Sequence, residues 1–492
     1  MRKNCFAGMV FAVVLSVCAP SAAKEVLVVA DRYDASTMDP IGHDEPATAR
    51  ACNALYDTLI HRDPIHNNAI PGLAESWEFL SSTEYKLRLR KGVKFHNGEE
   101  MKAEDVRYSL MRLRADEHGR NIEDVEILDD YTVVIRLQSV DYSFFPSLSD
   151  SWGSIVSKNA VETAGGRYDM APVGTGPFKF VSWRKGDRYV LERFEDYWGP
   201  KPRYKTLEVR SIPEPSRRLA ELESGRIDIA FPIDEESAKR IEDNERLTLY
   251  RTPQSSVGYM GFNLKKEPFS DIRVRRAIFA ALDVERIHAN VWSGEGKVPG
   301  SLLPASIRYS IDAEIAPHVQ DVELAQSLLA EAGVKHLKLE IWTSGHKKRV
   351  DIAAIIRGQL QKIGIAAEVK VLAWDVYLNQ LKKNTYDLFL MGWRYSLPDP
   401  NFSVASLLET GSEHNYTFFN DAELDELLKK GRSTPDGEQR AAIYKKIQLH
   451  INEQLPMIYL YARGSVIGAQ KYVKGFKPGF GENHSFQEVY FD

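Results

Sequence analysis

Hydrophobic residues recur with two different periods along this chain. At residues 84–90 and 131–137 apolar and polar positions alternate, which predicts antiparallel strands with one solvated face. At residues 102–113 the apolar positions recur at helical spacing instead. The stretch from about residue 66 to 171 is therefore predicted to form a small α+β module.

Helix and strand patterns alternate beyond residue 317. Helices are predicted at 321–332, 349–363 and 376–383, and strands at 337–342, 367–372 and 387–392. Such a βαβ order predicts a parallel sheet. Before it, residues 270–282 form the strongest amphipathic helix, which Ser270 or Asp271 can cap and whose arginines Arg273, Arg275 and Arg276 are expected on the outside.

The third of these strands runs into the sequence YDLFLMGWRYSLPDPNF at residues 386–402. Gly392 follows an apolar run with the backbone freedom that a bend or a close ligand approach needs. Ligands of open α/β sheets bind beyond the carboxyl ends of the strands, so Trp393, Arg394 and Tyr395 are candidates for a pocket wall. The alternative is a rigid loop whose aromatic side chains fill a core.

The first 23 residues have the pattern of an export signal. Arg2 and Lys3 precede a mostly apolar run at 6–17, and small residues follow at 20–23, so the mature chain is expected to begin at Lys24. A lipoprotein signal at Cys18 is the alternative, although Val17 occupies a position where a small residue is preferred. Removal of the signal leaves Cys52 as the one cysteine, which excludes an intramolecular disulfide and favours a small buried side chain.

Charge and motifs exclude several classes of function. The chain has 64 Lys and Arg against 69 Asp and Glu, and loss of Arg2 and Lys3 with the signal moves its net charge from −5 to about −7. This acidic balance argues against nucleic acid as a partner. The sequence holds no assembled nucleophile, base and oxyanion site, and the pair His61 and His66 lacks the spacing of a closed metal site. We therefore expect a binding protein with no catalytic residues, metal or cofactor.

Several short motifs occur in an order that resembles the bacterial extracellular solute-binding proteins of family 5, the oligopeptide, dipeptide, opine and nickel receptors of ABC importers. They are LYDTL at 55–59, PGLAESW at 71–77, LRLRKGVKFHNGEE at 87–100, GTGPF at 174–178, PFSDIRVRRAIFAALD at 268–283, Gly392-Trp393 and Pro398-Asp399-Pro400. Each motif alone is weak, but their order is specific and spans nearly the whole mature chain.

The resemblance implies an α/β, two-lobed periplasmic binding protein of type II, with an extra inserted domain and a hinge between the lobes. The domains expected after the signal at 1–23 are domain I at 24–65, 172–258 and 466–492, the inserted domain II at 66–171, and the βαβ lobe, domain III, at 259–465. The implied role is a periplasmic, monomeric receptor that closes around a solute and delivers it to membrane permease subunits with their ATPase.

Peptide is the leading ligand because peptide receptors are the most frequent members of the family. The family's peptide receptors hold the α-amino group with an acidic residue in the loop after Gly-Trp. In this sequence Ser396 stands at that position, and Asp399 replaces it only if the loop is reshaped. Arg394 could meet an anionic group. Met38 and Trp374 complete the candidate ligand-binding residues. A non-peptide solute such as an opine, sugar conjugate or metal chelate is the second hypothesis, and an exported hydrolase is the third.

Overall fold

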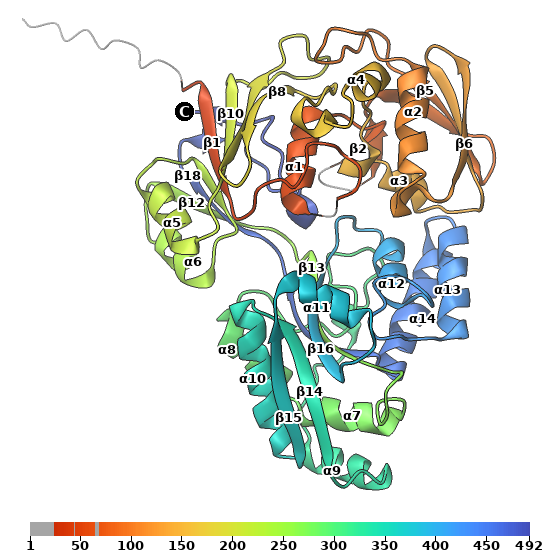
Figure 1. The fold of residues 1–492 in the computed structure, drawn as a ribbon, viewed down its shortest axis with the longest axis vertical. Coiled ribbons are helices and arrows are strands. Elements are labelled where there is room, and N and C mark those ends of the chain that lie inside the picture. Colours follow the sequence, from red (N-terminus) through yellow and green to blue (C-terminus); the bar gives the residue numbers. More distant parts are fainter. Residues whose placement is uncertain (1–23, 44, 64–67) are drawn as a thin grey trace, which may run out of the picture.

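The computed structural model describes residues 24–43, 45–63 and 68–492. The expected export signal at 1–23 and the second histidine of the pair, His66, lie outside the described residues. Three sheets organise the chain, and they gather into two lobes (Figure 1). The first lobe holds a seven-stranded and a four-stranded sheet, and the second lobe holds a five-stranded sheet.

The seven-stranded sheet collects strands from three distant parts of the chain. Its order is β12-β18-β11-β1-β10-β9-β8, and β1 runs parallel to both of its neighbours. The strands are β1 (Val26–Asp31), β8 (Phe178–Arg184), β9 (Arg188–Arg193), β10 (Thr206–Ser211), β11 (Ile229–Phe231), β12 (Leu247–Arg251) and β18 (Val466–Gln470). Helices α1 (Pro46–Leu55), α5 (Pro215–Glu223) and α6 (Glu235–Glu242) accompany them.

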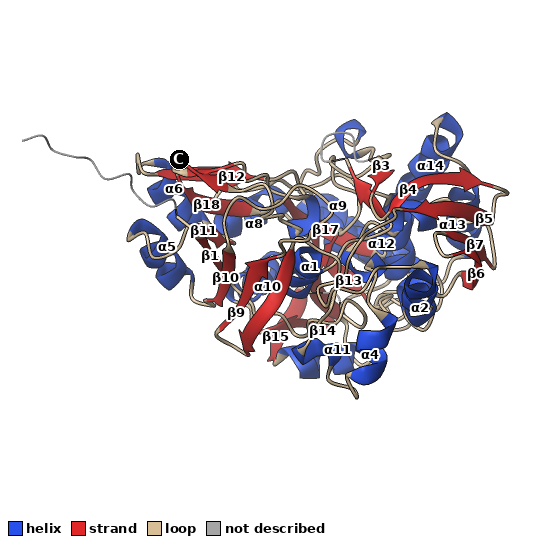
Figure 2. Ribbon diagram, turned by 90° about the horizontal axis from the view of Figure 1, so that it is seen from above, coloured by secondary structure: helices blue, strands red, loops and turns tan. Residues whose placement is uncertain are grey.

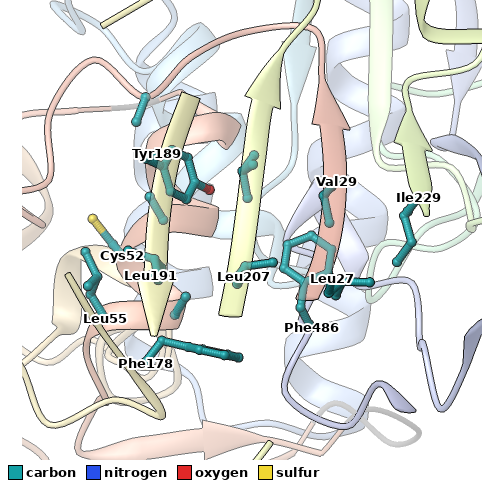
Figure 3. Close-up of a cluster of buried hydrophobic side chains, with 14 of the residues drawn as sticks. Leu27, Val29, Cys52, Leu55, Phe178, Tyr189, Leu191, Leu207, Ile229 and Phe486 are labelled. Atoms are coloured by element: carbon teal, nitrogen blue, oxygen red, sulfur yellow. The ribbon is translucent and has the colours of Figure 1, made fainter. Parts of the chain in front are cut away.

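The core of this sheet is apolar and well filled. Leu27 and Val29 of β1 lie beside Leu207 of β10 and Leu191 of β9, and Cys52 reaches the cluster from α1 (Figure 3). Cys52 is fully buried, so the prediction of a small buried side chain at this position is confirmed. Burial raises the pKa of its thiol well above the usual value, which makes it a poor nucleophile.

The four-stranded sheet has the order β4-β5-β7-β6 and is antiparallel throughout. Its strands are β4 (Ala74–Phe79), β5 (Glu84–Leu89), β6 (Ile122–Asp129) and β7 (Thr132–Leu137), and α2 (Ala103–Leu113) packs on it. In β5, Tyr85, Leu87 and Leu89 are buried while their neighbours are more exposed, which confirms the predicted alternation. Short elements extend this region: β2 (Ile60–Arg62), β3 (Ala69–Pro71), α3 (Phe144–Ser147), η2 (Ser151–Gly153) and α4 (Lys158–Thr163).

The five-stranded sheet has the order β15-β14-β16-β13-β17. Its strands are β13 (Ser256–Phe262), β14 (Leu337–Ser344), β15 (Ile365–Leu372), β16 (Leu388–Arg394) and β17 (Met457–Arg463). The three predicted βαβ strands are parallel to one another, as expected, but β13 pairs antiparallel with both of its neighbours, β16 and β17. The expectation of a parallel sheet is therefore wrong at β13, which arrives from outside the βαβ unit and whose direction the βαβ pattern could not reveal.

Helices surround this second sheet. They are α7 (Ile272–Ala281), α8 (Val284–Trp292), α9 (Val322–Glu331), α10 (Lys347–Gln361), α11 (Trp374–Leu381), α12 (Pro400–Leu408), α13 (Ala422–Ser433) and α14 (Glu438–Gln454). Asp271 caps α7 as predicted, by accepting a hydrogen bond from the backbone N–H of Arg273 at 2.8 Å. Arg275 was expected outside but is buried, because its guanidinium donates to the carbonyls of Phe269, Ser270, Gln454 and Leu455.

Two neighbouring segments connect the lobes. The chain leaves β12 and enters β13 through residues 252–255, and it returns from β17 to β18 through residues 464–465. Backbone hydrogen bonds join them, from Thr252 N–H to Ser465 O at 3.0 Å and from Ser255 N–H to Arg463 O at 2.8 Å. Gly464 is required here because a Cβ would lie 2.0 Å from the Thr252 carbonyl oxygen. Strand β13 begins at Ser256, directly after the first crossing.

Seen from above, the two lobes overlap, and the four-stranded sheet lies at one end of the molecule (Figure 2). Close to the chain end, β19 (Val473–Lys474) pairs with β20 (Tyr490–Phe491). The C-terminus therefore lies near β1, on the first lobe (Figure 1).

Candidate functional site

A cavity of about 320 Å³ lies between the two lobes. It is lined by residues of the first lobe, which are His43, Ala49, His118, Asp150, Ser151, Trp152 and Asn483. It is also lined by residues of the second lobe, which are Tyr259, Trp374, Leu378, Met391, Gly392, Trp393, Arg394, Ser396, Phe402, Leu407, His414 and Tyr416. Aromatic side chains dominate these walls and a few polar groups are set among them, which is the composition of a small-molecule site.

Strand β16 forms the floor of the cavity on the second-lobe side. It pairs with β13 as far as Arg394, opposite Ser256, so Trp393 and Arg394 are strand residues and not the loop residues that the sequence predicted. Gly392 lies in extended backbone and lines the cavity. The indole N–H of Trp393 is buried without an acceptor among the described residues, so it can donate to a bound solute.

Positive charge gathers at this second-lobe wall. The guanidinium of Arg394 donates a hydrogen bond to the carbonyl of Gly481 in the first lobe at 2.8 Å. Arg349 at the start of α10 stands over the ring of Trp374, with 5.4 Å from its guanidinium carbon to the ring centroid. Burial, followed by the charges of Arg349 and three other basic residues, lowers the pKa of His346 to about 4. The field at this wall therefore favours an anionic group.

The first-lobe wall contains the single acidic residue among the described lining residues, Asp150. It caps η2, where Oδ1 accepts hydrogen bonds from Ser151 N–H at 2.7 Å and Ser151 Oγ at 3.2 Å. Oδ2 is buried and accepts no hydrogen bond from any described residue. The side-chain oxygen of Asn483, Oδ1, is likewise buried without a donor among them. This wall therefore offers acceptors that a ligand can satisfy.

Aromatic contacts and hydrogen bonds cross between the lobes beside the cavity. His118 stacks on Trp152 with 4.7 Å between ring centroids, and it lies 5.0 Å from Phe402 of α12 in the second lobe. The backbone N–H of Tyr142 donates to the carbonyl of Arg432 at 2.9 Å. These contacts close the two lobes against each other around the cavity.

The structure brings four of the seven predicted ligand-binding residues to this cavity. Trp393, Arg394, Ser396 and Trp374 line it, and Trp374 is 46% exposed at its rim. Three others lie elsewhere. Tyr395 is completely buried in the second-lobe core, where its hydroxyl donates to the carbonyl of Leu302.

The other two residues, Asp399 and Met38, lie outside the cavity and contribute to the fold. Asp399 caps α12 by accepting from the N–H of Asn401 at 2.9 Å, and its carboxylate pairs with Arg440, with Oδ2 2.6 Å from Nη1. Met38 is fully buried in the core of the first lobe, and its carbonyl accepts a hydrogen bond from the Tyr56 hydroxyl at 2.8 Å. The reshaped loop that would release Asp399 for a ligand is not present in this structure.

None of the helices in the described part of the chain is long and apolar enough to cross a membrane. The described residues also contain no group of three or more His, Cys, Asp or Glu side chains placed to hold a metal ion.

Comparison with known families identifies the chain. The family model of the bacterial extracellular solute-binding proteins, family 5, matches residues 68–415. The chain belongs to this family. It is therefore a solute-binding protein of an ABC importer and not an enzyme.

Relatives of this family 5 protein match nearly its whole length. The dipeptide-binding protein of Escherichia coli K12 is 27% identical over 474 residues, which is 88% of each chain. DppA of Helicobacter pylori, solved in complex with the peptide STSA, is 27% identical with a TM-score of 0.85, over 95% of this chain and 98% of its own. AgaA of A. tumefaciens R10, solved with agropinic acid, is 26% identical with a TM-score of 0.83, over 95% and 99%. These matches confirm the predicted two-lobed fold.

Sequence reasoning missed the first-lobe wall of this family 5 protein. The turn Asp150-Ser151-Trp152 and the residues His118 and Asn483 lie in stretches without hydrophobic periodicity, far from β16 along the chain. The only local signal was an acidic cap next to a tryptophan in such a stretch. That signal says nothing about which lobe faces it.

Proposed function

We propose that this protein captures short peptides in the cavity between its lobes. The observation that carries the proposal is the charge arrangement of the cavity: an acid, Asp150, stands on the first lobe and a base, Arg394, on the second. A solute with one cationic and one anionic end, as in a short peptide, would satisfy both. Charge-assisted hydrogen bonds in a desolvated cavity are strong and leave a mismatched ligand with buried unpaired charge.

The size of the cavity supports a short ligand. Its volume of about 320 Å³ lies at the lower end of the range for small-molecule sites, which suits two or three residues better than a long peptide. Aromatic walls at Tyr259, Trp393 and Tyr416 would hold apolar side chains with little sequence preference. The dipeptide-binding relative and DppA, which was solved with the peptide STSA, support a peptide in this class of cavity.

An opine is the second candidate, and one observation favours it. Ser396 lines the cavity at the position where the family's peptide receptors carry an acid, and Asp399 nearby is engaged by Arg440. A solute without a peptide α-amino group would need no acid in that loop. The AgaA match shows that the same fold accommodates agropinic acid.

Ligand capture would work through lobe closure. A ligand that contacts both lobes favours the closed arrangement by its differential affinity for it, and the pair of crossing segments at 252–255 and 464–465 is the natural hinge. The closed, loaded protein would then deliver the solute to permease subunits in the membrane. We propose export by the signal at residues 1–23 to the periplasm, where the protein acts as a monomer.

The domain limits also remain our proposal. Domain I comprises 24–65, 172–258 and 466–492, with the four-stranded sheet inserted at 66–171 as domain II, and domain III comprises 259–465. We move the limits of domain III to 256–463, so that they coincide with the start of β13 and the end of β17, and those of domain I to 255 and 464 accordingly.

Thermal unfolding with ligand panels tests the peptide proposal. The mature protein would be heated with separate pools of di-, tri- and oligopeptides and with opines such as agropinic acid. A ligand at about 100 times its dissociation constant stabilises the folded state by about 2.7 kcal/mol, which raises the melting temperature by several degrees. We expect short peptides to produce this shift. A shift with opines and none with any peptide pool would overturn the peptide assignment.

A further inference from the structure

Asp150 has an unusual environment for a carboxylate. It is 5% exposed, lies at the cavity, and uses only one of its two oxygens within the protein. The unused oxygen, Oδ2, is buried and has no donor among the described residues. An ionised carboxylate in such a position costs several kcal/mol unless something pairs with it.

Arg62, a cation that interacts with Asp150, does not provide that pairing. Arg62 lies in the same region, and its guanidinium donates to the hydroxyl of Ser149 at 2.9 and 3.3 Å and not to Asp150. Burial lowers the pKa of Arg62 and the charge of Asp150 raises it, so the two groups interact at a distance without a hydrogen bond. Arg62 balances part of the charge and leaves Oδ2 without a hydrogen bond from any described residue.

The second lobe offers no alternative anion beside the cavity. Ser396 is neutral, and Asp399 is held by Arg440 and by the N-terminus of α12. Among the described lining residues, only Asp150 can meet a cation with an opposite charge.

We propose that Oδ2 of Asp150 is the acceptor for a protonated amine of the solute, and that this makes an amine a requirement for binding. This inference rests on the proposed function of the cavity and specifies which end of the ligand meets which lobe. The amine end lies on the first lobe and the anionic end lies toward Arg394 on the second. The acid that binds the amine therefore lies on the first lobe and not in the loop after Gly392-Trp393. The ligand contacts both lobes, one with each end.

The test combines a change in the ligand with a change in the protein. Wild type and Asp150→Asn would be titrated by calorimetry with a dipeptide that the thermal screen shows to bind, and with its N-acetylated form. Asparagine keeps an acceptor for the cap on Ser151 and removes the charge. We expect N-acetylation to weaken binding to the wild type by about 10- to 100-fold, as for loss of a hydrogen bond to a charged group. The variant should bind both forms with similar, weak affinity.

Asp141→Asn is the matched control. Asp141 also accepts from a nearby serine, Ser143, through its N–H at 2.9 Å and its hydroxyl, and it is half-buried in the same lobe, but it does not line the cavity. This variant should keep the preference for the free amine. If Asp150→Asn does not fold, the affinities of the wild type for the two ligands still test whether binding requires a free amine.

The outcomes separate the two proposals. Equal affinity of the wild type for the dipeptide and its N-acetylated form would overturn the role of Asp150 while peptide binding stands. If no peptide binds, the same comparison uses an opine that binds and its N-acylated form. Loss of affinity on acylation, absent in Asp150→Asn, would then support Asp150 and reject the peptide proposal.

Discussion

Asp399 and Asp150, two acidic residues in turns near the cavity, differ in whether the second carboxylate oxygen has a hydrogen-bond partner. Asp399 and Asp150 both cap a helix with one oxygen. The second oxygen of Asp399 is taken by Arg440, which is 1% exposed, whereas the second oxygen of Asp150 has no donor among the described residues. Asp399, which could have replaced the acid that is missing at position 396, is therefore structural, and an acid in an unpatterned turn is available to a ligand. Position in a motif is a weaker guide to function than an inventory of hydrogen-bond partners.

The largest effect should come from breaking the structural pair. Arg440→Met leaves the carboxylate of Asp399 partly buried and unpaired, which should lower the free energy of unfolding by about 3–5 kcal/mol. Urea unfolding followed by circular dichroism measures this change. Arg308→Met is the control, because Arg308 pairs with Asp436 at an exposed site and should change stability by less than about 1 kcal/mol. Equal losses in the two variants would remove the distinction between the acidic turns.

The next effect concerns the cavity wall and should appear in ligand affinity. Trp393→Ala removes an aromatic surface and the indole donor, and should weaken binding by about 2 kcal/mol, or roughly 30-fold. Titration calorimetry with the peptide selected by the thermal screen measures it. Trp374→Ala, at the exposed rim, should cost less. Affinity unchanged by Trp393→Ala would exclude β16 as a ligand wall.

The smallest effect is expected for a change at Tyr395, two residues after Trp393. Tyr395→Phe removes only the hydroxyl that donates to the Leu302 carbonyl in the core, so stability should fall by about 1 kcal/mol and ligand affinity should stay unchanged. The same urea and calorimetry experiments measure both quantities. A clear loss of ligand affinity with unchanged stability would show that Tyr395 contacts the ligand.

The sequence was sufficient to predict the strands and helices whose apolar residues recur at a regular spacing. Alternation in β5 and helical spacing in α7 were predicted correctly, because burial of one face imposes these patterns directly. The end of β16 was placed too early because Gly392 resembles a strand break, while pairing with β13 carries the strand on to Arg394. The neighbours of β13 in the sheet are set by chain crossings that no local pattern encodes.

The site itself was predicted on one lobe only. The motif around Gly392-Trp393 located three of the predicted lining residues, Trp393, Arg394 and Ser396, and the missing charge of Ser396 raised the question of how a peptide amine would be held. The answer we propose, Asp150, depends on which lobes face each other and on which oxygens remain unpaired. Both are tertiary properties, so the residue sequence could not supply them.

A crystal structure of the protein with a bound dipeptide tests the central claim most directly. The ligand amine should lie within about 3.2 Å of Asp150 Oδ2, with the ligand carboxylate toward Arg394 on the second lobe. A ligand whose amine contacts the 395–399 segment, with Asp150 unoccupied, would contradict the account.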